Sequence, residues 1–186
     1  MRAIWVGVLL LMSALGFAQK APAADRTSLI WEYAGERMAR QIDIWFDEGD
    51  FPRCVQLLRV QFIQDPTDYD NATNLGWMLE NIERDDEAIA IYIRFNQANP
   101  KDPDRSFPEA DYYFRNKAYA KVPPLLEPVL KSKPQPNAFR ILAHSYERLN
   151  QLKDSKRVWQ TYIGLVPSDG AAKRNLERVE RKLKGA

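Results

Sequence analysis

The chain is poor in cysteine and histidine. Its 186 residues include one cysteine, Cys54, and one histidine, His144. A single thiol excludes a disulfide framework and a zinc site built from several cysteines. Cys54 and His144 lie in distant parts of the sequence, so they are not expected to form a nucleophile–base pair. The sequence therefore predicts no metal, no cofactor and no enzymatic activity.

Two further kinds of site are missing. The sequence has no glycine-rich loop of the type that binds phosphate groups. The oxygen-rich stretch DPTDYDN, at 65–71, lacks the glycine and the distal glutamate of a calcium-binding loop, and helix capping explains its composition. The net charge of +2 indicates no particular class of partner.

One long hydrophobic run is present, at the N-terminus. Apolar and small residues continue unbroken from Ala3 to Ala18, after the single charge of Arg2. A membrane-spanning helix needs about 20 such residues, so this run is short for one. The pattern is typical of a cleavable secretory signal over residues 1–18, with cleavage after Ala18 or as late as Ala23. We expect an exported protein, periplasmic if bacterial; an uncleaved N-terminal anchor is the alternative.

Prolines recur through the rest of the chain at a nearly constant spacing. Pro66, Pro100, Pro134 and Pro167 are separated by 34, 34 and 33 residues. A large apolar residue stands eight positions before each proline: Leu58, Tyr92, Leu126 and Trp159. A small or modest residue stands twelve positions before it: Cys54, Ala88, Val122 and Ser155. Four units in register make a strong repeat signal.

This pattern resembles the tetratricopeptide repeat, a helix-turn-helix unit of 34 residues. The resemblance implies an all-α, right-handed superhelical solenoid of about four units over residues 27–167, because one unit cannot bury its apolar face alone. The units are expected at about 35–68, 69–102, 103–135 and 136–169. A disordered linker at 19–26 would precede them. A basic amphipathic capping helix with a frayed tail, at 168–186, would follow.

The second unit indicates how the two helices of each unit pack. Gly76 and Ala88 are expected at the point where the helices cross, where close packing offsets the helix-propensity cost of glycine, about 1 kcal/mol. Asp85 or Asp86 is expected to cap the second helix. Asn99 and Pro100 are expected to end it.

Three segments depart from the regular unit. In the third unit, the first helix is expected to start after Pro108, and the second to begin near Val122 and bend near Pro128. The first helix of the array should extend back to Thr27, and its apolar residues could shield the front of the solenoid: Ile30, Trp31, Ala34 and Met38. The last helix should present one apolar face: Ala172, Leu176, Val179 and Leu183.

Charge is distributed unevenly along the array. Residues 41–111 carry a net charge of −10 and residues 112–186 a net charge of +10. Drift in the composition of solvated surfaces would explain this. A partner of complementary charge, or association between copies of the chain, is the alternative.

The resemblance also implies a concave groove lined by the first helix of each unit. Its expected partner-binding residues are Asp43, Phe46, Trp77, Glu80, Asn81, Asp111, Phe114, Arg115, Arg140, His144 and Arg148. Arg140 and Arg148 could together hold an acidic group. We therefore expect a scaffold or adaptor in the cell envelope that binds a peptide segment or helix of another protein.

A structural role is the alternative function. The acidic half of one copy could meet the basic half of another to form a homo-oligomer, or the basic C-terminal helix could contact a membrane surface. Export argues against a nucleic-acid partner.

Overall fold

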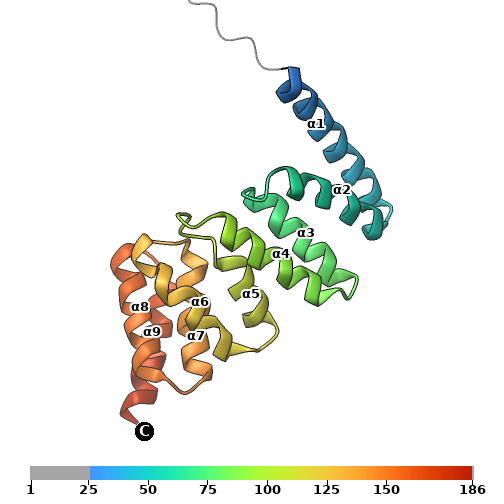
Figure 1. The fold of residues 1–186 in the computed structure, drawn as a ribbon. Helices are drawn as coiled ribbons and strands as arrows, with labels where there is room; N and C mark the ends of the chain where they lie inside the picture. The colour runs from blue at the N-terminus through green and yellow to red at the C-terminus, as the bar shows by residue number, and fades with distance from the viewer. Residues whose placement is uncertain (1–25, 186) are drawn as a thin grey trace, which may run out of the picture.

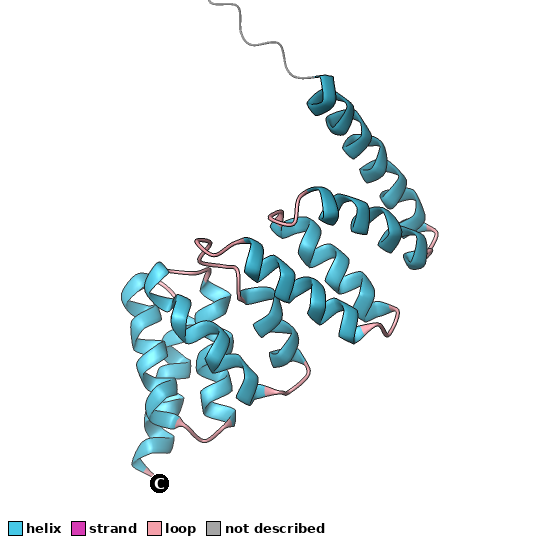
Figure 2. Ribbon diagram, in the orientation of Figure 1, coloured by secondary structure: helices cyan, strands magenta, loops and turns pink. Residues whose placement is uncertain are grey.

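The fold is an array of helices that runs from one end of the molecule to the other. The computed structural model describes residues 26–185, and these contain helices and loops but no strand (Figure 2). The expected signal segment and its cleavage sites lie outside the described residues. So does the expected linker, apart from Arg26, which is the first residue of a helix.

The helices follow one another as antiparallel pairs stacked side by side (Figure 1). Each helix packs chiefly against its neighbours in the sequence, which is the contact pattern of a solenoid. The prediction of an all-α solenoid is confirmed. In chain order the elements are α1 Arg26–Asp47, α2 Phe51–Gln64, α3 Tyr69–Asn81, α4 Asp85–Ala98, α5 Phe107–Arg115, the 3-10 helix η1 Tyr119–Lys121, α6 Val122–Leu126, the 3-10 helix η2 Glu127–Ser132, α7 Pro136–Arg148, α8 Leu152–Leu165 and α9 Gly170–Lys184.

The turn inside each unit has the same backbone geometry. One residue per turn has a positive φ: Gly49, Glu83, Lys117 and Asn150. The N–H of the next residue donates to the carbonyl five positions earlier, at 2.7–2.9 Å: Asp50 to Trp45, Arg84 to Leu79, Ala118 to Tyr113 and Gln151 to Tyr146. This is the Schellman ending of a helix. Its recurrence at the spacing of the prolines shows that four helical pairs share one turn.

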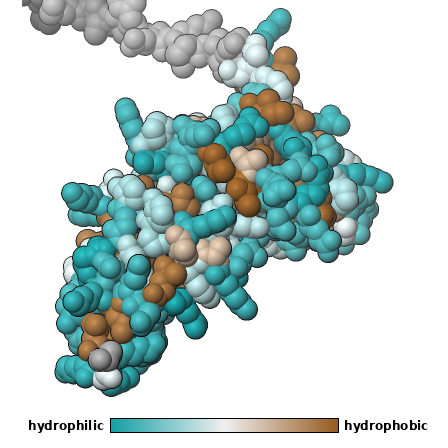
Figure 3. Space-filling model, turned by 60° about the horizontal axis from the view of Figure 1, so that its bottom comes forward, coloured by the Kyte–Doolittle hydropathy of each residue, from teal (hydrophilic) through white to brown (hydrophobic). Residues whose placement is uncertain are grey.

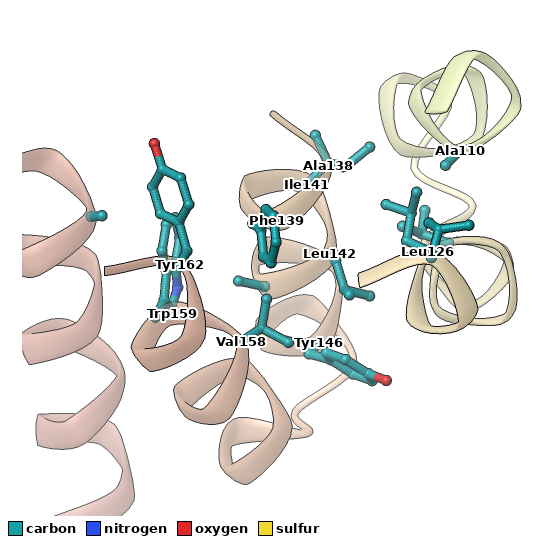
Figure 4. Close-up of a cluster of buried hydrophobic side chains, with 14 of the residues drawn as sticks. Ala110, Leu126, Ala138, Phe139, Ile141, Leu142, Tyr146, Val158, Trp159 and Tyr162 are labelled. Atoms are coloured by element: carbon teal, nitrogen blue, oxygen red, sulfur yellow. The ribbon is translucent and has the colours of Figure 1, made fainter. Parts of the chain in front are cut away.

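Apolar residues form two buried clusters, one in each half of the array. The first lies between α1 and α5 and is centred on residues such as Leu75, Leu79 and Phe95. The second lies between α5 and α9 and includes Phe139 and Trp159 (Figure 4). The four large apolar residues that stand eight positions before a repeated proline are all buried in these clusters: Leu58, Tyr92, Leu126 and Trp159.

Gly76 contacts a ring rather than a small residue. A Cβ atom built on Gly76 would lie 2.2 Å from Cε1 of Tyr92. Tyr92 is buried, and its hydroxyl donates to Glu80 Oε1 at 2.7 Å. Glycine is therefore required because the Tyr92 ring lies flush against the α3 backbone. Ala88 is also fully buried.

Aspartates cap several helices, although not the one that we expected. Asp50, Asp68 and Asp169 accept hydrogen bonds from N–H groups in the first turns of α2, α3 and α9. The N-cap of α4 is Arg84, which makes no side-chain capping bond, so the expectation for Asp85 or Asp86 was wrong. Both aspartates instead lie in the first turn, where their negative charge interacts favourably with the positive end of the helix dipole.

The third unit has the irregular second helix that its prolines predict. An α-helix begins at Val122, as expected, and changes at Glu127 to a 3-10 helix that contains Pro128. The missing N–H of Pro128 accounts for the break in the α-helical hydrogen bonds. The first helix of this unit, α5, begins at Phe107, so Pro108 lies in its first turn rather than before it.

The two ends of the array differ in how well they are covered. At the C-terminal end, α9 buries Ala172 and Val179 against the second cluster, as predicted. At the N-terminal end, α1 does extend back past Thr27, but it contains no buried residue. Ile30 and Trp31 are 66% and 43% exposed, so the expectation that they shield the solenoid was wrong. The reason is length, because α1 has 22 residues and its partner α2 has 14.

Candidate partner-binding groove

Three aromatic rings lie together where the first two units meet. Phe46 lies in the last turn of α1, Phe51 begins α2, and Trp77 lies on α3. The centre of the Phe46 ring lies 5.6 Å from that of Phe51 and 6.1 Å from that of Trp77. Phe46 is 42% exposed and Trp77 44% exposed, which is high for such large apolar side chains. We call Phe46, Phe51 and Trp77 the aromatic cluster.

A pocket continues from Trp77 toward α5. Its volume is about 330 Å³. Aromatic and proline side chains form most of its wall, and polar groups lie at one end. The lining residues are Tyr69, Thr73, Trp77, Tyr92, Phe107, Pro108, Asp111 and Arg115. Such a lining is suited to an apolar side chain held in position by a few polar contacts.

The polar end of this pocket is an ion network. Arg115 on α5 donates to Glu80 on α3, with Nη1 to Oε2 at 2.6 Å and Nη2 to Oε1 at 3.0 Å. Its Nε donates to Asp111 Oδ2 at 2.8 Å. The bond to Glu80 is the main reason that the pKa of Arg115 is raised. Burial, helped by the hydrogen bond to Glu80, likewise raises the pKa of the Tyr92 phenol.

The network leaves this part of the groove with excess negative charge. Two carboxylates, Glu80 and Asp111, surround the one guanidinium of Arg115. Asp43 is exposed on α1, the helix that contributes Phe46. An occupant that places an apolar group in the pocket and a cation near its rim would therefore be favoured.

A second pocket lies between α7 and α9. It has a volume of about 450 Å³ and is mostly polar. Its lining residues are His144, Glu147, Arg148, Arg178 and Lys182, and we call it the basic pocket. The His144 ring packs edge-on against Trp159, with 5.1 Å between ring centres. Burial, with a contribution from Arg178, lowers the pKa of His144, so its imidazole is neutral at neutral pH.

Arg140 and Arg148 do not act as a pair. Arg140 donates to Asp169 Oδ2 at 2.8 Å and to the Tyr162 hydroxyl at 3.0 Å, whereas Arg148 lines the basic pocket. The hypothesis that these two arginines together hold an acidic group was wrong. Asp169 already neutralises Arg140 within the fold.

The structure brings several of the other predicted groove residues together. Trp77, Asp111 and Arg115 share one pocket, and Glu80 bonds to Arg115. Asn81 is exposed and donates to the Trp77 carbonyl at 2.7 Å. Phe114 is half-buried against Tyr119, with 5.7 Å between ring centres, so it offers less free surface than Phe46 or Trp77. Their role in binding stays a prediction.

Several lining residues were not predicted from the sequence. Tyr69 and Phe107 lie in the first turns of α3 and α5, before the positions assigned to the groove. Arg178 and Lys182 come from α9, which we expected to cap the array or, in the alternative function, to contact a membrane surface. Arg178 and Lys182 would have been predicted if the groove had been assumed to extend past the four units to α9.

Other kinds of site are not found in the described part of the chain. Within residues 26–185, no group of histidine, cysteine and acidic side chains is placed to hold a metal ion. Over the same residues, no helix is both long and apolar enough to cross a membrane. Cys54 is buried and its thiol donates to the Ile42 carbonyl at 3.5 Å. Burial raises the pKa of this thiol, so it is not activated as a nucleophile.

Solved structures of MamA have a similar fold. A MamA double mutant from RS-1 has a TM-score of 0.63 and 17% sequence identity, over 80% of this chain and 84% of that chain. MamA 41-end from Desulfovibrio magneticus RS-1 has a TM-score of 0.61 and 17% identity, over 80% and 85%. A crystal structure of MamA has a TM-score of 0.61 and 14% identity, over 77% and 84%.

MamA is a tetratricopeptide-like helical protein, and this chain has the same kind of solenoid fold. At these identities the likeness shows the fold alone. No protein-family model matches the sequence, and a comparison with curated proteins finds no similar sequence.

Proposed function

We propose that the chain is a scaffold or adaptor that binds another protein, and that the groove along α1, α3 and α5 holds an extended segment or a helix of that partner. The observation that carries this proposal is the exposure of Phe46 and Trp77 beside a pocket with an ordered polar end. Large aromatic side chains contribute much of the binding energy of protein interfaces. The proposal assigns the chain no catalytic role.

The site favours a particular kind of segment. The pocket beside Trp77 has room for an apolar side chain, and the carboxylates of Glu80 and Asp111 would attract a neighbouring lysine or arginine. The ion network with Arg115 holds these carboxylates in place before binding, which reduces the entropy lost on association. Export to the cell envelope, or to the periplasm of a bacterium, is part of the proposal and rests on the N-terminal sequence.

The test is affinity capture from the envelope fraction with the full chain as bait. The Phe46→Ala, Trp77→Ala double variant should lose a protein that the wild type enriches. The matched control is Ile63→Ala, Ile93→Ala, which removes two exposed apolar side chains from α2 and α4. Circular dichroism should give the same helicity for all three proteins. Equal recovery of the same partner with the aromatic variant would refute the groove assignment.

A self-assembling structural element is the second candidate. The opposite charges of the two halves favour it, and so does the exposed apolar surface of α1, which contains Leu29, Ile30, Trp31 and Tyr33. Hydrophobic residues also gather in the upper part of the described surface in Figure 3. Sedimentation velocity of the full chain at low and moderate salt separates the two functions. A monomer at low salt would exclude self-assembly driven by charge.

A further inference from the structure

We propose that the basic pocket between α7 and α9 is an anion-binding site that takes the carboxylates of an acidic segment in a protein partner. This inference rests on the proposed function, since it names the chemistry of a second segment of the partner, which would bind outside the groove along α1, α3 and α5. It uses none of the residues of the aromatic cluster, so the two proposals can fail separately.

The basic pocket carries more positive than negative charge. Three cations, Arg148, Arg178 and Lys182, line the pocket with one carboxylate, Glu147, which leaves a surplus of two positive charges. Arg148 makes no ion pair with any residue from 26 to 185. Elsewhere the arginines of the groove side are compensated within the fold: Asp169 pairs with Arg140, and two carboxylates pair with Arg115.

Glu147 holds the donors of the basic pocket in a fixed arrangement. The Glu147 side chain is only 9% exposed and accepts from Arg178 Nε at 3.0 Å and from Arg178 Nη2 at 2.7 Å. It also accepts from Lys182 Nζ at 2.8 Å. This forked contact shows that the pocket's donors are already spaced for a carboxylate. Glu147 thus fixes the heads of two long cationic side chains that would otherwise be mobile.

The basic pocket has further N–H donors that these bonds do not use. A guanidinium has five N–H groups, and Arg178 uses one more on Asn175 Oδ1, at 2.7 Å. An ammonium has three, and Lys182 uses one on Glu147. The remaining N–H groups and the whole of Arg148 are available to an incoming anion. Because the neutral His144 ring forms one wall against Trp159, the pocket is recessed rather than flat.

The distribution of charge along the array favours an acidic protein segment as the occupant. Such a segment would be repelled by the half at 41–111, with its net charge of −10, and attracted to the half at 112–186. A recessed pocket admits individual side chains, whereas a membrane would first meet the exposed basic residues of α9, such as Lys173 and Arg174. An acidic segment would therefore lie along α7 and α9, with its carboxylates in the basic pocket.

The test measures the binding of a fluorescein-labelled peptide that contains a run of consecutive glutamates, by fluorescence anisotropy with the full chain. A peptide with lysines in place of the glutamates is the charge-reversed probe. The glutamate peptide should bind more tightly at low salt, and the Arg148→Gln, Lys182→Gln variant should weaken it by about tenfold or more. Lys173→Gln, Arg174→Gln is the matched control, because it removes the same two types of charge outside the pocket.

Several outcomes would overturn the proposal. Equal weakening by the two charge-matched variants would mean non-specific attraction, and no preference for the glutamate peptide would mean that no site exists. If the wild type binds vesicles that contain phosphatidylglycerol and only the pocket variant loses this binding, the pocket would be assigned to lipid phosphate. Self-association lost in the same variant would assign it to a second copy of the chain.

Two further variants separate loss of the anion site from loss of stability and from loss of the aromatic cluster. Arg148→Gln alone removes no ion pair from the described fold, so it tests the site even if the double variant is destabilised. Phe46→Ala, Trp77→Ala should bind the glutamate peptide as wild type does, even though it loses the partner in the capture experiment. Loss of glutamate-peptide binding in this variant would refute the separate location of the anion site.

Discussion

Replacement of Gly76 by alanine should destabilise the protein, although alanine is the better helix former. In an exposed helix this change gains about 1 kcal/mol. Here the new Cβ would lie 2.2–2.4 Å from three atoms of Tyr92, well inside van der Waals contact. The Tyr92 ring would have to move, but it is buried and bonded to Glu80.

The size of this effect follows from the contacts that must be lost. Overpacking of a core costs about 1–3 kcal/mol, and a broken hydrogen bond to a charged group adds about 1.5 kcal/mol or more. After the helix-propensity gain is subtracted, we expect a net loss of about 2 kcal/mol in the free energy of unfolding. The measurement is urea denaturation followed by circular dichroism at 222 nm.

A matched control separates the contact from the intrinsic propensity. Gly164 lies in α8 and has nothing within 4 Å of the position of its Cβ. Gly164→Ala should therefore stabilise the protein by up to about 1 kcal/mol. In a double-mutant cycle, Tyr92→Ala should remove most of the cost of Gly76→Ala. A Gly76→Ala protein as stable as the wild type, or a cycle without coupling, would refute the role assigned to the ring.

Two further predictions concern the repeated turn and the ion pairs of the last helix. Glu83 has a φ of 61°, a backbone conformation that glycine adopts at lower cost than other residues, so Glu83→Gly should raise the free energy of unfolding by about 1 kcal/mol. Gly49 has a φ of 75°, so Gly49→Ala should lower the free energy of unfolding by a similar amount. The reverse order of stabilities in urea denaturation would contradict the turn geometry. Burial alone would raise the pKa of Glu147, but hydrogen bonds from Arg178 and Lys182 outweigh it and lower the pKa to about 2. Since this folded-state pKa lies below the ordinary value of 4.5, the stabilisation is fully present above pH 4.5 and is lost as the pH falls toward 2. Glu147→Gln should therefore cost about 2 kcal/mol at pH 7 and progressively less below pH 4.5; a cost that does not change with pH would contradict the ion-pair role.

The repeat and its breaks could be read from the sequence because they depend on local rules. The spacing of Pro66, Pro100, Pro134 and Pro167 and the alternation of large and small residues predict paired helices in register. Proline chemistry predicts the start of a helix at Val122 and the irregularity at Pro128. These features depend on residues that are close together in the sequence, so they can be predicted without knowing how distant elements pack.

Other details were beyond the sequence because they depend on which side chains meet. The sequence marks Gly76 as a close contact but does not say that a tyrosine ring fills the space. It placed Arg140 in a binding pair, whereas Asp169, the N-cap residue of α9, neutralises its charge. The sequence suggested that Ile30 and Trp31 shield the apolar core, but α2 is too short to pack against them.

By itself, the sequence determined the class of fold, the number and phase of the helical pairs, and the opposite charges of the two halves. These follow from periodicity and composition, which act over a few residues at a time. Only the tertiary structure decided which charges remain uncompensated. Arg140 is neutralised, Arg115 is surrounded by carboxylates, and Arg148 lies beside Arg178 and Lys182 without an ion pair among residues 26–185. The physical reason is that electrostatic compensation depends on distances between side chains of different helices, which the packing of the array fixes.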